Sequence, residues 1–140
     1  MFGSMMALGV GLALSLTPPQ TEKAPAQPLD LHPVEARVIE RTNSQRIRHG
    51  LRPLRVDRRL LSSARRHAAW MTNARSMTHT SAAVAENIAM GQNSSAEVIN
   101  AWMNSSGHRA NILNPSYTRI GVAAYTTPSG TIYWCQQFLR

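Results

Sequence analysis

The order of two hydrophobic periodicities along the chain restricts the fold more than any other feature of the sequence. Apolar residues recur at helical spacing after Asp57, which is placed to cap a helix, and the segment from Ser94 to Glu97 has the form of a capping box. After Pro115 the pattern alternates as in β-strands, over 120–124 and 132–138, with a turn at 128–130 between them. Helices followed by strands predict an α+β domain.

The length of the chain supports one such domain. With 140 residues, of which 43% are hydrophobic, there is room for a single core. Residues 1–16 form an apolar segment that resembles a signal-peptide core and predicts export, and residues 17–32 form a proline-rich linker. If the apolar segment is not cleaved, it would remain as a membrane tether. We expect the folded domain over 33–140, beginning with a helix from Pro33 that stops at Gly50.

The chain is strongly basic, and arginine carries almost all of the positive charge. The formal net charge is +8, and seven arginines lie between positions 52 and 75 with only Asp57 opposing them. Guanidinium groups pair well with phosphate and carboxylate, so this run is a candidate contact for an anionic lipid or cell-envelope polymer. The simpler interpretation is a solvated helix face. Nucleic acid is disfavoured because only Trp70 interrupts the run with an aromatic ring.

The cysteine content excludes an internal disulfide bond, because Cys135 stands alone. In the alternating segment around it, Cys135 shares one face with Tyr133 and Gln137, while Trp134 and Phe138 face the other way. We therefore interpret Cys135 as a small core residue rather than a nucleophile.

Three side chains are candidate site residues: His79, Glu86 and His108. Apolar neighbours on both sides of Glu86 suggest that its backbone is buried. A buried carboxylate needs a cationic or hydrogen-bonding partner, and the two histidines are the nearest candidates. Two neutral imidazoles could also bind a divalent metal such as zinc, although their spacing matches no short metal motif. A buried hydrogen-bond network that fastens loops to the sheet is the equally weighted alternative.

Several sequence blocks occur in the order typical of one protein family. The early blocks are Asn43 with Arg46, then 49–51, 64–71 and 77–79, and the closing ones are 120–122 and 133–134. The strongest are the segments Glu-Asn-Ile-Ala at 86–89 and Gly-His-Arg-Ala-Asn-Ile-Leu at 107–113. From about residue 34 to 138 the chain thus resembles the CAP superfamily of cysteine-rich secretory, antigen 5 and pathogenesis-related proteins, in its short bacterial form.

This resemblance implies a three-layer α-β-α sandwich around a small antiparallel sheet, with a cavity lined by two histidines and two glutamates. His79, Glu86 and His108 match three of these cavity residues, while Ser105 stands where many members have the second glutamate. A hydroxyl in place of that carboxylate would make a metal site at His79 and His108 less anionic. The resemblance also marks four residues of structural motifs: Asn87, Trp102, Gly107 and Asn111.

Three functions remain open at this point. The preferred one is an exported binding or interaction module at the cell envelope or outside the cell, whose His/Glu cleft is a candidate site for a divalent metal. Lipid or sterol binding is a second mode, implied by the resemblance alone. The third is a metal-dependent or serine hydrolase acting on peptide or cell-wall material, with Ser105 or Ser106 beside His108. Neither serine lies in a Gly-x-Ser-x-Gly frame, so no catalytic residue is assigned.

Overall fold

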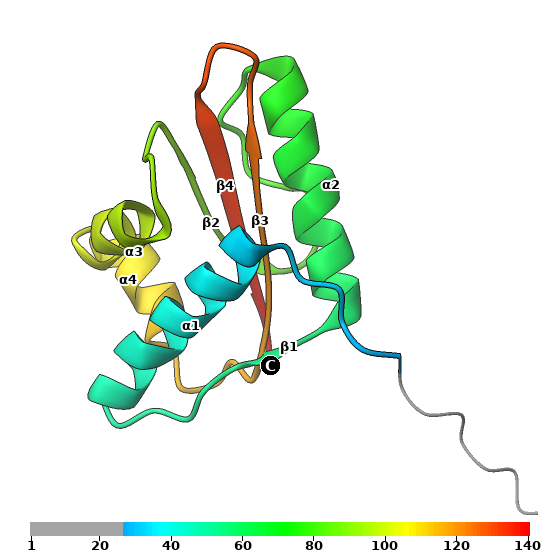
Figure 1. The fold of residues 1–140 in the computed structure, drawn as a ribbon. Coiled ribbons are helices and arrows are strands. Elements are labelled where there is room, and N and C mark those ends of the chain that lie inside the picture. Colours follow the sequence, from blue (N-terminus) through cyan, green and yellow to red (C-terminus); the bar gives the residue numbers. More distant parts are fainter. Residues whose placement is uncertain (1–26) are drawn as a thin grey trace, which may run out of the picture.

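The computed structural model describes residues 27–140, so the predicted apolar segment at 1–16 and the linker residues 17–26 lie outside the described part of the chain. The helices are α1 (Pro33–Arg48), α2 (Arg58–Ala74), α3 (Ser95–Met103) and α4 (Ser106–Ile112), and the strands are β1 (Arg55–Val56), β2 (Ala85–Met90), β3 (Arg119–Thr126) and β4 (Ile132–Leu139). Helix α2 lies on one side of the sheet, and α1, α3 and α4 lie on the other (Figure 1). The predicted three-layer α-β-α sandwich is confirmed.

The sheet is mixed, with the strand order β1-β3-β4-β2. The predicted hairpin of β3 and β4 is present, and β2 pairs antiparallel with β4. The prediction of a purely antiparallel sheet is wrong at β1, where Arg55 and Val56 pair in parallel with Arg119 and Ile120. The chain between β1 and β3 runs through α2, β2, α3 and α4, and a connection of that length allows two neighbouring strands to run in the same direction.

The helix starts follow the capping residues that the sequence offers. Helix α1 begins at Pro33 as predicted, and the carboxylate of Asp57 accepts two backbone N–H groups of the first turn of α2 at 2.8 and 3.0 Å. The Ser94 hydroxyl accepts the Glu97 N–H at 3.1 Å, but the Glu97 carboxylate accepts the N–H of Asn93 instead of returning to Ser94. The capping box at α3 is therefore only half formed.

The sheet separates two apolar cores. On the α2 side Cys135 is fully buried beside Tyr133 and Met71, in the position expected of a small core residue. The larger core lies between the sheet and the other three helices, around Trp102 and Trp134. Alternation along the strands thus sends consecutive residues into different cores.

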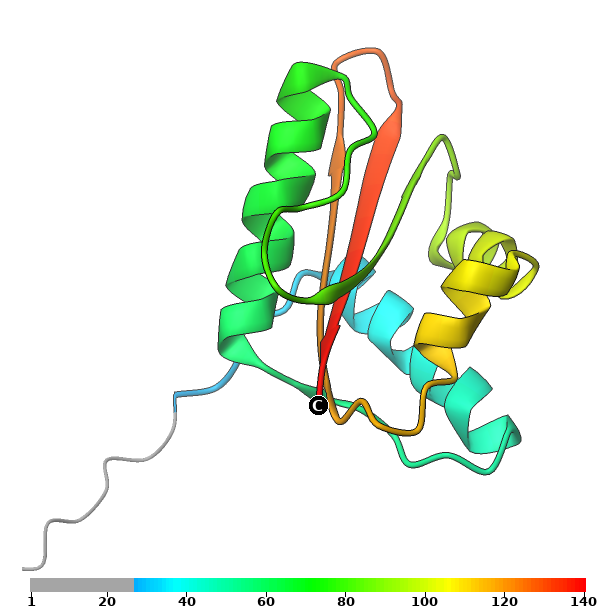
Figure 2. The same ribbon diagram turned by 180° about the vertical axis from the view of Figure 1, so that it is seen from behind.

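Helix α2 lies close to the sheet at Gly121 of β3. A Cβ atom built on Gly121 would collide with the backbone of Leu60, so only glycine allows this approach. The approach sets α2 against β3 and β4, and the segment 75–84 that follows α2 then crosses the same face of the sheet before entering β2 (Figure 2). That crossing segment carries His79.

Candidate functional site

The candidate site is organised by β2, which pairs only with β4 and so forms one edge of the sheet. Glu86 and Asn87 are consecutive residues of this strand, and both are buried. Because side chains alternate along a strand, Glu86 faces α2 and Asn87 faces α4 and α1. Each residue is the centre of a separate hydrogen-bond network.

The carboxylate of Glu86 is the acceptor of the first network. Its Oε1 accepts the Nδ1–H of His79 at 2.9 Å and the backbone N–H of Thr80 at 2.9 Å. Its Oε2 accepts the side-chain amide of Gln137 at 2.8 Å and lies 3.5 Å from the thiol sulfur of Cys135. These contacts fasten the segment 75–84 to the sheet and fix the ring of His79, whose side chain is 63% exposed.

Two opposing effects act on the pKa of Glu86. Burial is the larger single effect and by itself would raise the pKa, because it disfavours the charged form. The hydrogen bonds from Gln137, from the Thr80 N–H and from His79, together with the nearby imidazole of His67, outweigh burial and hold the pKa below its ordinary value. The site therefore contains a buried, ionised carboxylate at neutral pH.

His67 on α2 is a neighbour of Glu86 that the sequence interpretation did not include. Its Nε2–H donates to the carbonyl oxygen of Thr78 at 2.6 Å, and this nitrogen lies 3.8 Å from Oε1 of Glu86. The ring also stacks on Trp70. His67 thus supports the segment before His79. The sequence shows that His67 lies on the apolar face of α2, but it does not show which segment packs against that face.

The side-chain amide of Asn87 is the centre of the second network. Its Nδ2 donates to the backbone carbonyl of His108 and to Oε1 of Gln136, both at 3.1 Å. Its Oδ1 accepts the amide of Asn111 at 2.9 Å, and Gln136 donates onward to the hydroxyl of Thr42 in α1 at 2.7 Å. Neutral amides therefore tie α4 and α1 to the sheet.

His108 lies on α4 and makes its side-chain contact within that helix. Ser105 is the N-cap residue of α4, and its Oγ lies 3.0 Å from Nδ1 of His108. Burial lowers the pKa of His108, and the charge of His79 lowers it further. The structure thus joins His79 to Glu86 and Ser105 to His108, and no hydrogen bond links the two pairs among the described residues.

A cleft of about 280 Å³ opens beside His108 and Ser105. The walls are mostly apolar and include Trp102, whose indole N–H donates to the carbonyl oxygen of Ile88 at 3.2 Å. Met77 and Met90 also line the cleft, with 43% and 50% of their surface exposed. The remaining residues that line the cleft are Ile88, Ala89, Gln92 and Ala101.

The four predicted motif residues take different structural roles. Asn87 and Asn111 bond to each other, and Trp102 is 1% exposed in the larger core. Gly107 is exposed in α4, and a Cβ built there would meet no heavy atom within 4 Å. Nothing in the structure explains a glycine at that position.

The two candidate metal ligands share one feature, which is that a neighbour already holds Nδ1 of each ring. Glu86 is the partner of Nδ1 in His79, and Ser105 is the partner of Nδ1 in His108. Nε2 of each ring is therefore the nitrogen available to a ligand. Across residues 27–140 no group of three or more His, Cys, Asp or Glu side chains is arranged to hold a metal ion. Each ring is thus oriented by one neighbour, and neither ring belongs to a group of three candidate metal ligands within the described residues.

Comparison with known sequences assigns the family. A family model described as the cysteine-rich secretory protein family, CAP, matches residues 39–138. The Bacillus subtilis protein YkwD is 38% identical over a 140-residue alignment that covers 88% of this chain and 53% of YkwD. The B. subtilis membrane protein YlbC is 27% identical, over 76% of this chain and 34% of YlbC. The chain thus spans about half of YkwD and about a third of YlbC.

Solved structures agree with this assignment. An extracellular protein with an SCP domain from Bacillus anthracis has 25% identity and a TM-score of 0.68, over 81% of this chain and 45% of that protein. An outer surface protein from Borrelia burgdorferi has 22% identity and a TM-score of 0.66, over 72% of this chain and 87% of that protein, and this likeness concerns the fold alone. Between residues 27 and 140 no helix has the length and hydrophobicity to cross a membrane. With its fold, its motifs and the family match over most of its length, the chain belongs to the cysteine-rich secretory protein (CAP) family.

Proposed function

We propose that this CAP domain is an exported binding module whose ligand site is the cleft beside His108, with a divalent cation held by His79 and His108. The proposal rests mainly on the fact that both imidazoles have a hydrogen-bonding partner at Nδ1, which leaves Nε2 of each ring available. Glu86 holds Nδ1 of one ring and Ser105 holds Nδ1 of the other, at 2.9 and 3.0 Å. Histidines that bind metals are oriented by such a partner on the second nitrogen.

The donor set fits a cation that accepts imidazole and water. Zinc and copper meet this condition, and two protein nitrogens leave the remaining positions to water or to an external ligand. Ser105 brings no negative charge, so the site is less anionic than a pair of glutamates would make it. We therefore expect weak, exchangeable binding rather than a closed structural site.

The size of the cleft restricts the organic part of a ligand. Pockets for small molecules usually measure about 300–1,000 Å³, and the volume of about 280 Å³ lies just below that range. A single apolar group, such as a peptide side chain or the end of an acyl chain, is favoured over a complete sterol. Met77 and Met90 at the cleft are flexible side chains that adapt to such groups.

Hydrolysis is supported less well than binding. The contact between Ser105 and His108 has the length of a nucleophile–base pair, but Ser105 is the N-cap of α4 and the contact is local to that helix. No carboxylate within the described residues bonds to the ring of His108, whereas the imidazole of a catalytic triad is oriented by one. Ser106 follows as the first residue of α4 and makes no bond to His108.

The proposed location outside the cytoplasm is supported by two observations. The apolar segment at 1–16, outside the described residues, has the length of a signal-peptide core. The solved relative from B. anthracis is described as an extracellular protein.

Calorimetric titration of zinc into the full chain at neutral pH tests the metal site. We expect one site per chain, lost in both His79→Ala and His108→Ala and retained in His49→Ala, an exposed histidine at the end of α1. Zinc at a hundred times its dissociation constant should stabilise the domain by about 2.7 kcal/mol. Absence of binding, or an equal loss in His49→Ala, would refute the metal site, and peptide or ester turnover that disappears in Ser105→Ala would favour the hydrolase.

A further inference from the structure

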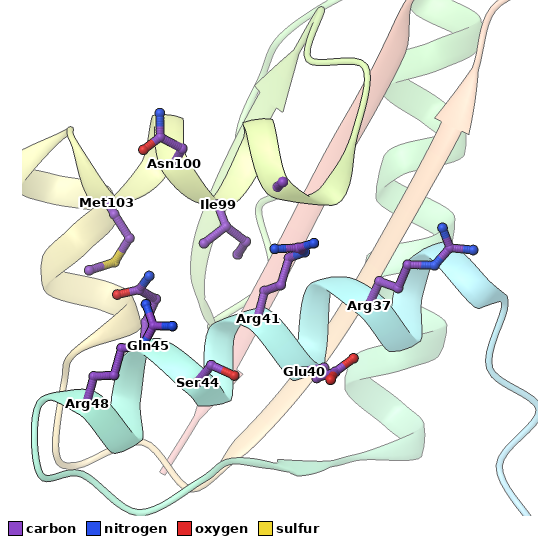
Figure 3. Close-up of a pocket in the computed structure, with 10 residues that line it drawn as sticks. Arg37, Glu40, Arg41, Ser44, Gln45, Arg48, Ile99, Asn100 and Met103 are labelled. Atoms are coloured by element: carbon purple, nitrogen blue, oxygen red, sulfur yellow. The ribbon is translucent and has the colours of Figure 1, made fainter.

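A stripe of three arginines runs along the exposed face of α1. Arg37, Arg41 and Arg48 are separated by four and seven residues, and eleven residues make about three turns of helix, so all three side chains project to the same side. With a rise of about 1.5 Å per residue, Arg37 and Arg48 lie roughly 16 Å apart along the helix axis. Figure 3 shows the three side chains spaced along α1, next to α3.

These arginines line a groove between α1 and α3 with a volume of about 490 Å³. Ser44, Gln45 and Asn100 contribute polar side chains to the groove, and Glu40 is its one acidic residue. The groove shares no lining residue with the cleft beside His108. It is therefore a hollow separate from that cleft, formed by different side chains.

The guanidinium groups of this stripe are not neutralised within the described residues. No carboxylate lies within ion-pair distance of any of the three, and the single partner among them is the Ser95 hydroxyl, which accepts the Nε–H of Arg41 at 3.2 Å. Other arginines have structural partners: Arg46 donates to four backbone carbonyls, and Arg65 pairs with Glu35 at 2.7 Å. The stripe thus concentrates positive charge without a partner from the fold.

We propose that this groove binds a linear polyol-phosphate polymer, a chain of phosphodiesters joined by hydroxylated carbons. One phosphate cannot reach guanidinium groups spread over roughly 16 Å, whereas a polymer places repeated charges along the stripe. The arginine fork matches phosphate oxygens, and the amides of Gln45 and Asn100 match polyol hydroxyls.

The lining of the groove argues against other polyanions. It contains no aromatic ring on which a nucleobase could stack. An acidic peptide would bring backbone N–H and C=O groups that need partners, and two helices offer no unpaired strand edge to it. Within the run at 52–75, the side chain of Arg65 is already engaged by Glu35.

A binding assay with two charge-matched triple variants of the full chain tests the proposal. The groove variant is Arg37→Ala/Arg41→Ala/Arg48→Ala, and the control is Arg58→Ala/Arg59→Ala/Arg66→Ala on α2, so both lower the formal net charge from +8 to +5. With fluorescent poly(glycerol phosphate) as the probe, we expect the groove variant to lose about tenfold or more in affinity and the control about threefold or less. The slope of the logarithm of the affinity against the logarithm of the salt concentration should fall in magnitude by about 2 in the groove variant, because three phosphate contacts are lost.

Three results would overturn the proposal: no binding by the parent chain, equal losses in both triple variants, or equally tight binding of a single-stranded oligonucleotide or of oligoglutamate that is lost in the same variant. Circular dichroism and thermal melting check folding, and Arg37→Ala and Arg48→Ala, which remove side chains without a bonding partner among the described residues, are the single variants to use if the triple variant does not fold. Zinc binding should be unchanged in the groove variant. Failure of the polymer site is thereby distinguishable from failure of the metal site.

Discussion

The two sides of strand β2 attach neighbouring segments to the sheet through different chemical groups. On the α2 side, the ionised carboxylate of Glu86 collects donors from the crossing segment and from β4. On the α4 side, the neutral amide of Asn87 donates and accepts at once. Each network fixes one histidine, because Glu86 holds the ring of His79 and Asn87 holds the backbone of His108. The candidate site therefore depends on two networks, of which only the one at the Glu86 carboxylate carries a charge.

The largest expected effect comes from Glu86→Ala on the charged side. The substitution leaves the amide of Gln137, the N–H of Thr80 and the ring of His79 without their acceptor, and an unpaired buried donor costs about 1–3 kcal/mol. The exposed ring of His79 can bond to water instead, so the cost comes from the donors of Gln137 and Thr80. We expect these two to lower the free energy of unfolding by about 3 kcal/mol. Urea denaturation measures it, with the exposed Glu40→Ala as control. A melting temperature within about a degree of the parent would show that the network does not stabilise the fold.

Asn87→Ala tests the neutral side and should have the next largest effect. It removes the donor to Oε1 of Gln136 and to the carbonyl of His108, and it leaves the Asn111 amide with only the Glu86 carbonyl as acceptor, at an expected cost of about 2 kcal/mol. The same denaturation experiment applies, with the exposed Asn73→Ala in α2 as control. If Asn87→Ala destabilises more than Glu86→Ala, the ranking of the two networks is reversed.

The sequence predicts the elements of this arrangement that have local signals and misses those that depend on tertiary contacts. The helix after Asp57 and the hairpin of β3 and β4 were accessible because capping and alternation are local signals. The strand β1 was not, because two residues form no pattern and its partner lies more than sixty positions away. The contacts of Glu86 divide in the same way. His79 is seven positions away, whereas Gln137 and His67 reach the carboxylate only through tertiary packing.

The pH dependence of stability separates the two sides further, with a smaller effect. Glu86 has a lowered pKa in the folded state, so the unfolded chain binds more protons and the stabilisation, present above the ordinary value of 4.5, is lost as pH falls through the folded value. His108 also has a lowered pKa, so protonation below its ordinary value of 6.5 favours the unfolded chain. Stability should therefore decline in two steps on acidification.

Denaturation at a series of pH values assigns the two steps. Glu86→Gln should reduce the lower step, to which Asp57 also contributes because the backbone N–H of Leu60 lowers its pKa, and His108→Gln should flatten the upper step. Asn87→Ala should lower stability at all pH values without changing either slope. A lower step of undiminished size in Glu86→Gln would assign it to Asp57 alone.

The smallest expected effect belongs to Cys135, the weakest donor to Glu86. Burial raises the pKa of its thiol well above the ordinary value, and the negative charge of Glu86 raises it further, so the sulfur stays protonated and shielded. Because a thiol donates weakly and Glu86 keeps its stronger donors, Cys135→Ala should cost only about 1 kcal/mol, close to the loss of one buried methylene-sized group. It should also leave the lower acid step in place.

A thiol-specific disulfide reagent should label the folded parent only at its rate of unfolding and label it fully in urea. Rapid labelling of the folded chain would mean that the Glu86 side of the sheet opens readily, and the charged network would then be the more dynamic of the two.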